Sequence, residues 1–227
     1  KESIVYKDFG LDTSLLMDMV WLMEHYGSGE EGVQKESALL YDCMHGLLEM
    51  AGSHGFSGNL WHCYLTNLLV NNENSYSRAC EIRGKVEGTI NEAVLHDIII
   101  FKEFFDYDFT NMMEKLQVPA FSLVLSYEGN MQDRICTLAV RFKENRTPEE
   151  MKDTLTEFYK EYGVGKFGLH KAFRISHKED ETLIEPILNI AHVQLGDLIG
   201  YETAKKKLVD NTEAFVKGKK ANNCLLY

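Results

Sequence analysis

The segment Thr147-Pro148-Glu149-Glu150 marks the start of a helix more clearly than any other stretch of the chain. Threonine is a favourable cap, proline suits the first helical position, and a glutamate three residues after the cap completes a capping box. This helix is predicted to run to Tyr162, where Gly163 can end it. Just upstream, apolar residues at helical spacing predict a second helix, and they are Ile135, Leu138, Ala139 and Phe142.

The same spacing predicts further helices towards the N-terminus, over residues 13–26, 33–50, 60–70 and 75–83. Residues 90–105 include an apolar run that suits a buried strand, but their length and their Glu, Ala, Leu and Lys content favour a largely buried helix. Residues 163–195 lose the helical period, and short strands are expected near 172–175 and 183–188. We therefore predict a mainly α fold, a helical N-terminal domain with a small α+β portion.

Composition narrows the classes of protein that this chain can belong to. The chain has 227 residues, of which 44% are hydrophobic, so it has enough apolar side chains to fold. A formal net charge of −11 disfavours binding to nucleic acid or to anionic lipid, and no apolar run approaches the roughly 20 residues that span a bilayer. Five scattered cysteines are typical of a reducing compartment, so we expect a cytoplasmic protein.

The distribution of charge indicates a boundary near Gly196. Residues 195–227 carry six lysines against four acidic residues, a net charge of +2, which leaves −13 for residues 1–194. We predict an N-terminal helical domain over residues 1–195 and the start of a second module over residues 196–227. This second part is expected to hold an amphipathic helix from about Tyr201 to Val216, ended by Gly218. The chain stops in an apolar run that suits a buried strand, so we expect the second module to be truncated.

Part of this second module resembles a known family. The residues that carry the resemblance are Asp197-Leu198-Ile199-Gly200-Tyr201-Glu202, Lys206, Asn211-Thr212-Glu213-Ala214-Phe215, Gly218-Lys219 and Ala221-Asn222-Asn223-Cys224-Leu225-Leu226-Tyr227. They are similar to the entry into the ATPase module of a bacterial family of predicted AAA-type P-loop ATPases, whose N-terminal region is classed as a domain of unknown function. Residues 156–165 and 171–175 are also similar to that family, whereas residues 1–90 share only its helical character. Cys224 and Lys220 depart from the valine and proline that are commoner in it.

The resemblance implies a first helix and strand of an α/β P-loop module that binds ATP and Mg²⁺ in the intact protein. It also implies that Ile199, Gly200 and Tyr201 contact the adenine ring. The phosphate loop itself, which ends in Gly-Lys-Ser/Thr, would follow Tyr227. The chain has only three Gly-Lys pairs, and the residues after them are Val86, Phe167 and Lys220. We therefore expect no ATP hydrolysis and no bound cofactor in this chain on its own.

The segment 163–178 combines glycines, basic residues and aromatic residues. Its first six residues fit the spelling G-x-G-x-x-G, but they follow a strong helix instead of a strand, so Gly163 is better interpreted as the end of that helix. Four side chains here, Lys166, His170, Lys171 and Arg174, are candidates for binding a phosphate or a partner. The simpler interpretation is that the lysines are solvated and that acidic residues 179–181 neutralise them.

Other clusters suit chemistry less well. Five nitrogen or sulfur ligands fall within residues 43–63, but they lack the paired spacing of a structural zinc site; they are Cys43, His45, His54, His62 and Cys63. The chain also lacks the G-x-S-x-G and H-E-x-x-H motifs. We expect neither a metal site nor a catalytic residue.

Two functions follow as hypotheses. In the first, the chain is the N-terminal part of an AAA-type ATPase that forms a homo-oligomer when intact. Its helical domain recognises a protein partner or substrate, or it regulates the ATPase. In the alternative, the chain is an independent small-molecule or phosphate-binding enzyme that uses the segment 163–178. A deep pocket around Lys166, His170 and Arg174 would favour the enzyme, and a broad surface patch would favour recognition.

Overall fold

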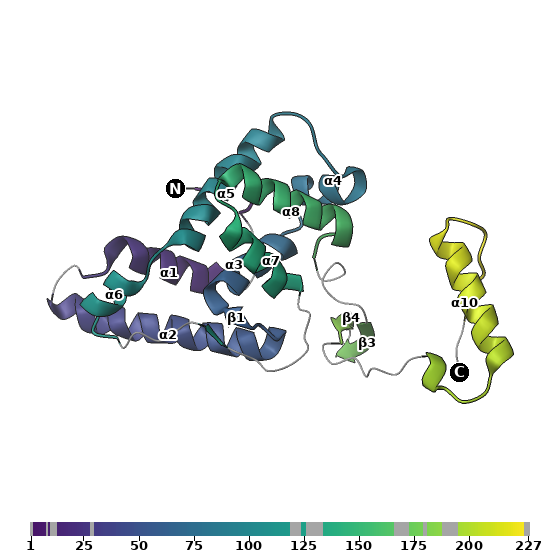
Figure 1. Ribbon diagram of the computed structural model, residues 1–227. Helices are drawn as coiled ribbons and strands as arrows, with labels where there is room; N and C mark the ends of the chain where they lie inside the picture. The colour runs from purple at the N-terminus through teal and green to yellow at the C-terminus, as the bar shows by residue number, and fades with distance from the viewer. Residues whose placement is uncertain are drawn as a thin grey trace. The chain divides into compact units, whose positions relative to one another are not determined.

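Helices make up most of the chain in the computed structural model, as the sequence predicts (Figure 1). The structure describes residues 2–7, 9, 13–27, 30–118, 124–125, 134–165, 173–178, 181–187 and 195–224. The chain divides into a first unit, Lys1–Leu188, and a second unit, Asn189–Tyr227. The boundary that we predicted from charge, near Gly196, falls inside the second unit.

The helices of the first unit are α1 (Thr13–His25), α2 (Glu30–His54), α3 (Leu60–Asn71), α4 (Ser75–Arg83), α5 (Ile90–Asp106), α6 (Thr110–Lys115), α7 (Arg134–Glu144) and α8 (Pro148–Tyr162). Its strands are β1 (Gly58–Asn59), β2 (Val124–Leu125), β3 (Phe173–Lys178) and β4 (Glu181–Pro186). The second unit contains a 3₁₀ helix, η2 (Leu195–Asp197), and α10 (Glu202–Val216). The sequence did not predict α6, β1 or β2.

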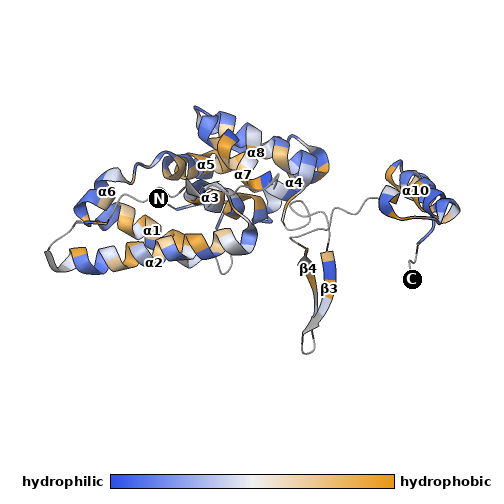
Figure 2. Ribbon diagram, turned by 60° about the horizontal axis from the view of Figure 1, so that its bottom comes forward, coloured by the Kyte–Doolittle hydropathy of each residue, from blue (hydrophilic) through white to orange (hydrophobic). Residues whose placement is uncertain are grey.

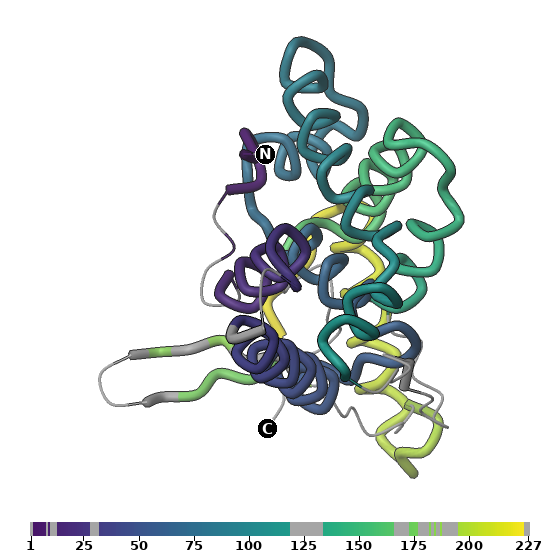
Figure 3. Tube along the Cα trace, turned by 90° about the vertical axis from the view of Figure 1, so that its left-hand side faces the viewer, coloured from purple at the N-terminus to yellow at the C-terminus, as the bar shows by residue number. Residues whose placement is uncertain are grey.

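Helix α3 lies at the centre of the first unit. Ten of its twelve residues are buried, including Trp61, Tyr64 and Leu68, because it is apolar on nearly all of its faces. It packs against α2, α5 and α7. Helices α1 and α2 pack against each other, and Figure 3 views this pair nearly end-on. The helical prediction for residues 90–105 is confirmed by α5, which has Ile98 and Phe101 buried against the core.

The start of α8 confirms the predicted cap with one difference. Thr147 Oγ1 accepts a hydrogen bond from the Glu150 backbone N–H at 3.2 Å, and Pro148 takes the first helical position. The Glu150 carboxylate accepts instead from the backbone N–H of Arg146, at 2.7 Å. Glu150 therefore reaches one residue further back than in a regular capping box, and it satisfies a donor just outside the helix.

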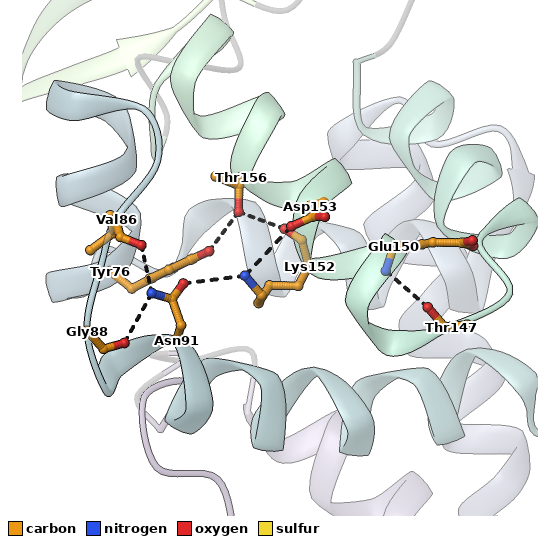
Figure 4. A network of polar contacts seen from close by, with 9 residues as sticks. All are labelled: Tyr76, Val86, Gly88, Asn91, Thr147, Glu150, Lys152, Asp153 and Thr156. Atoms are coloured by element: carbon orange, nitrogen blue, oxygen red, sulfur yellow. Dashed lines mark hydrogen bonds and ion pairs between the residues drawn. The ribbon is translucent and has the colours of Figure 1, made fainter.

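A network of polar contacts joins α8 to α4 and to the start of α5 (Figure 4). Thr156 Oγ1 donates to the Lys152 carbonyl at 2.7 Å, so the hydroxyl of Tyr76 is the donor in its 2.7 Å contact with Thr156. Lys152 Nζ contacts Asn91 Oδ1 at 3.4 Å, and Asn91 Nδ2 donates to the Val86 carbonyl. These bonds satisfy polar groups that lie between packed helices. They explain why polar residues occupy these positions, which the apolar pattern does not address.

The N-terminal segment is held to α5 by one carboxylate. Asp97 is fully buried and accepts hydrogen bonds from the backbone N–H groups of Ile4, Val5 and Tyr6, at 2.8, 2.7 and 2.9 Å. His96 Nδ1 lies 3.0 Å from Asp97 Oδ1, the oxygen that also accepts from Ile4. Burial alone raises the pKa of Asp97, but these hydrogen bonds together lower it below the usual 3.8. The segment is thus anchored by a charged group.

Strands β3 and β4 form an antiparallel hairpin whose register pairs Ile175 with Ile184 and Arg174 with Glu185. Both strands were expected from the sequence. The pairing of β1 with β2 joins residues 58–59 to residues 124–125, which are far apart in the chain. None of the helices in the described ranges combines the length and the apolar character that a membrane crossing needs.

Candidate functional site

The first candidate site surrounds the entry into α10. Gly200 and Tyr201 both have positive φ, 87° and 59°, and they turn the chain into the helix. Such a backbone suits glycine well but costs energy at tyrosine. The Tyr201 carbonyl accepts from the Lys205 N–H at 2.9 Å, while Lys205 Nζ contacts the Leu198 carbonyl and the Glu202 carboxylate. This turn holds the side chains of Ile199 and Tyr201 in solvent, 96% and 81% exposed.

A shallow apolar groove of about 310 Å³ runs along α10. Its apolar lining comes from Leu195, Leu208, Val209 and Val216, and its polar lining from Thr212, Glu213 and Lys217. Figure 2 shows both hydrophobic and hydrophilic residues on this helix. None of the residues from Leu195 to Cys224 is buried. The apolar face of α10 is therefore open.

The three residues that the resemblance assigns to adenine lie together, immediately before α10. Ile199, Gly200 and Tyr201 are accessible to a ligand, but they are not among the residues that line the groove. Their exposure suits contact with a flat apolar ring.

Of the four candidate residues in segment 163–178, only Arg174 is described. It lies on β3, is exposed, and is directly opposite Glu185 in the hairpin register. Lys166, His170 and Lys171 lie outside the described residues.

Two glycines of the glycine pattern in this segment, Gly163 and Gly165, shape the end of α8 and the chain just after it. Gly163 has φ = 83° and its N–H donates to the Tyr159 carbonyl at 2.9 Å, so it ends α8 as predicted. Gly165 also has positive φ, and its N–H donates to the Val70 carbonyl at 2.9 Å. Both glycines serve the packing of the chain after α8.

A second cavity, of about 570 Å³, lies in the first unit where β1, α3 and α7 meet. Its lining residues are Ser57, Gly58, Asn59, His62, Cys63, Cys136, Thr137, Ala139, Val140, Lys143 and Glu144. Two thiols lie together in it, because Cys63 Sγ is 3.5 Å from Cys136 Sγ. The cavity thus combines sulfur, hydroxyl and amide groups with a lysine.

Charged groups beside this cavity are held by specific contacts. Asp106 binds two lysines, Lys102 at 2.7 Å and Lys143 at 3.3 Å. Partial burial raises the pKa of Asp106, but the hydrogen bonds and charges of these two lysines lower it on balance. Lys143, which lines the cavity, is therefore fixed near its rim.

His62 lines the cavity with its imidazole ring. Burial lowers its pKa below 6.5, although its hydrogen bond to the Phe105 carbonyl partly opposes that shift. Its Nε2 lies 2.9 Å from that carbonyl, which can only accept, so Nε2 carries the hydrogen. The ring also stacks on Phe105.

The five residues considered for zinc do not form one cluster in the structure. His62 and Cys63 line the cavity, whereas Cys43 is buried in the core and burial raises its pKa to about 12. His45 and His54 are exposed on α2. In the described ranges no three side chains of His, Cys, Asp or Glu are grouped to hold a metal ion.

Sequence reasoning missed the cavity because its second thiol, Cys136, lies 73 residues from Cys63. One signal was available: Cys136 falls beside the apolar stripe of α7, and Cys63 falls in an apolar helix. Only the packing of α3 against α7 brings the two together.

A family described as a protein of unknown function (DUF815) matches residues 168–227, which include the β3–β4 hairpin and the second unit. No curated protein and no solved structure matches the chain. The match includes residues 197–227, which carry the densest resemblance to the ATPase entry.

Proposed function

We propose that residues 1–195 form a recognition or regulatory domain for a protein partner or substrate, and that residues 196–227 begin an AAA-type ATPase module. The observation that carries this proposal is the open apolar face of α10. An amphipathic helix gains most of its stability by burying its apolar face against other elements. The first unit, in contrast, has its own core, from Tyr6 to Val164.

In this proposal the chain holds only the adenine part of a nucleotide site. Ile199, Gly200 and Tyr201 contact the adenine ring, and the phosphates and Mg²⁺ are held by a loop that follows Tyr227 in the intact protein. Nowhere do the 227 residues contain a glycine-lysine pair followed by serine or threonine. The chain by itself is therefore not catalytic.

The family match over residues 168–227 supports a shared origin for the residues that resemble the ATPase entry, although it begins upstream of the proposed boundary. The intact protein acts in the cytoplasm as a homo-oligomer, in which the nucleotide state alters the geometry between modules. The first unit transmits that change to a bound partner.

ATP hydrolysis tests the proposal. A polypeptide that continues past Tyr227 through the phosphate loop is expected to hydrolyse ATP with Mg²⁺, and the 227-residue chain is expected not to. Removal of residues 1–188 from the longer polypeptide should leave hydrolysis but change its rate. Turnover by the 227-residue chain alone contradicts the proposal, and so does complete loss of turnover when the first unit is removed.

The adenine contact has its own test in the longer polypeptide. Ile199→Ala should raise KM for ATP by about tenfold with little change in kcat, because it removes binding and no chemistry. Leu198→Ala is the matched control, since Leu198 is an exposed neighbour outside the assigned contact. Equal KM values for the two variants would show that Ile199 does not contact adenine.

A further inference from the structure

The two thiols in the cavity of the first unit lie in direct contact. Cys63 Sγ and Cys136 Sγ are 3.5 Å apart, and they come from different helices, α3 and α7. A disulfide bond needs a sulfur separation of about 2.05 Å, so the two sulfurs must approach by about 1.5 Å to form one.

The two thiols make different hydrogen bonds to the backbone of Ser57. Cys63 Sγ donates to the Ser57 carbonyl at 3.2 Å, whereas Cys136 Sγ accepts from the Ser57 N–H at 3.2 Å. Cys136 is also the third residue of α7, and the first turn of a helix favours negative charge. Both features favour the thiolate form of Cys136, which is the nucleophilic form of a cysteine.

Access also differs between the two thiols. Cys136 is partly exposed, while Cys63 is only 1% exposed. Both line the cavity of about 570 Å³, which has room for a small peroxide. Lys143, which pairs with Asp106, and the acidic Glu144 also line this cavity, so both signs of charge are present. A reagent that enters thus meets Cys136 before Cys63.

We propose that Cys136 is a peroxide-reactive thiol and that Cys63 is its resolving partner, so that oxidation joins α3 to α7 by a disulfide. The Cys136 thiolate attacks one oxygen of hydrogen peroxide; an S–O bond forms, the O–O bond breaks, and the released hydroxide takes a proton to become water. The Cys63 sulfur then attacks the sulfenic sulfur; an S–S bond forms, the S–O bond breaks, and the hydroxyl leaves as water with the Cys63 proton.

The balance of the reaction is two thiols oxidised by two electrons and one peroxide reduced to two waters. A small dithiol reverses it by thiol–disulfide exchange. Oxidation also removes the S–H donor that Cys63 supplies to Ser57, the residue just before β1. The disulfide therefore changes the contacts at one wall of the cavity. The reaction uses only residues of the first unit and does not depend on the ATPase proposal.

The other cysteines provide internal controls. Cys43 and Cys80 are buried, and burial raises the pKa of both thiols. Cys224 is exposed in the second unit, where Asn211 Nδ2 contacts its sulfur. A thiol that reacts only because it is exposed would be Cys224, and one that reacts through the arrangement in the cavity would be Cys136.

Peptide mapping tests the proposal on the unaltered chain. The reduced protein is treated with one equivalent of hydrogen peroxide at pH 7, alkylated, digested without reductant and analysed by mass spectrometry. The expected result is a linked pair of peptides containing Cys63 and Cys136, a mass about 2 Da lower, and recovery by dithiothreitol. A linkage between other cysteines, or five thiols still open to alkylation after unfolding, would overturn it.

Variants in a Cys224→Ser background assign the two roles. In Cys63→Ser, Cys136 should accumulate as a sulfenic acid that dimedone traps, whereas Cys136→Ser should lose the peroxide reaction by at least about tenfold. Cys80→Ser is the matched control, because it also removes a buried thiol and should leave the disulfide yield unchanged. Circular dichroism checks that each variant is folded. Equal peroxide rates for Cys136→Ser and its parent would show that Cys136 is not the attacking thiol.

Discussion

Phe142 and Phe215 are the same type of residue on two amphipathic helices, but Phe142 is fully buried and Phe215 is 73% exposed. Phe142 lies on α7, where α3 and Phe105 cover it. Phe215 lies on α10, whose residues are all at least partly exposed. A helical pattern of apolar residues therefore predicts a helix in both units, while burial depends on whether other elements supply a second surface.

The largest expected difference between the two units is in the free energy of unfolding when each phenylalanine is replaced by alanine. Phe142→Ala should lower the free energy of unfolding by about 3–5 kcal/mol, because it leaves a cavity in a packed core. Phe215→Ala should change it by less than about 0.5 kcal/mol, because an exposed side chain loses little contact. Urea unfolding followed by circular dichroism measures both. A large loss for Phe215→Ala would mean that something covers the face of α10 in solution.

A carboxylate from each unit gives the next largest difference. Asp97→Ala should cost about 3 kcal/mol, because it leaves three backbone N–H groups without an acceptor. Glu213→Ala removes an exposed ion pair with Lys217 and should cost about 0.5 kcal/mol or less. Thermal unfolding of the two variants side by side measures the contrast, and similar losses would contradict the anchoring role of Asp97.

The charge of Asp97 also predicts a dependence on pH. Its pKa is lower in the folded state than the usual 3.8, so the unfolded state binds its proton first as the pH falls. Its contribution is therefore complete above about pH 4 to 5 and is lost as the pH falls through the folded pKa. The free energy of unfolding of the Asp97→Asn variant should change less with pH across this window. Urea titrations at several pH values would measure it.

The starts of α8 and α10 provide a smaller contrast. Thr147→Ala should cost about 1 kcal/mol, because it removes the acceptor for the Glu150 N–H. Tyr201 makes no side-chain hydrogen bond to α10, so Tyr201→Ala should have no measurable effect on stability. Thr147→Ser keeps the hydroxyl and is the control. If serine does not restore stability, the loss in the alanine variant comes from packing.

The smallest effect concerns His62, whose pKa is lowered by burial. Because the unfolded state takes up the proton near pH 6.5 and the folded state resists it, stability should fall as the pH drops through 6.5 towards the folded pKa. His62→Gln can still donate to the Phe105 carbonyl but does not titrate. The free energy of unfolding of this variant should therefore depend less on pH between pH 7 and 5. An unchanged dependence on pH would assign the effect to another group.

Local signals predicted most of the helices. The cap at Thr147, the glycine at Gly163 and the apolar stripe of α7 act within a few residues, so they can be found without knowledge of the fold. Apolar spacing also predicted the helix α2, but Leu48 on this helix is 47% exposed. Whether such a position is covered depends on the neighbouring helix, which the pattern does not describe.

The candidate sites divide in the same way. Ile199, Gly200 and Tyr201 are consecutive, so a resemblance in sequence was enough to select them. The pairing of residues 58–59 with 124–125 and the contact of Cys63 with Cys136 join segments that are distant in the chain. No short-range pattern reports such contacts, because they arise only when whole helices pack.

The sequence by itself determined the helical class, the capped start of α8, the short strands near 172–175 and 183–188, and the change of composition near Gly196. These features follow from backbone preferences and from the period of apolar residues, which act locally. Tertiary structure alone decided that α3 is central, that Asp97 anchors the N-terminal segment, and that two thiols share a cavity. The physical reason is that burial and proximity belong to pairs of surfaces, and a single segment specifies only one surface of each pair.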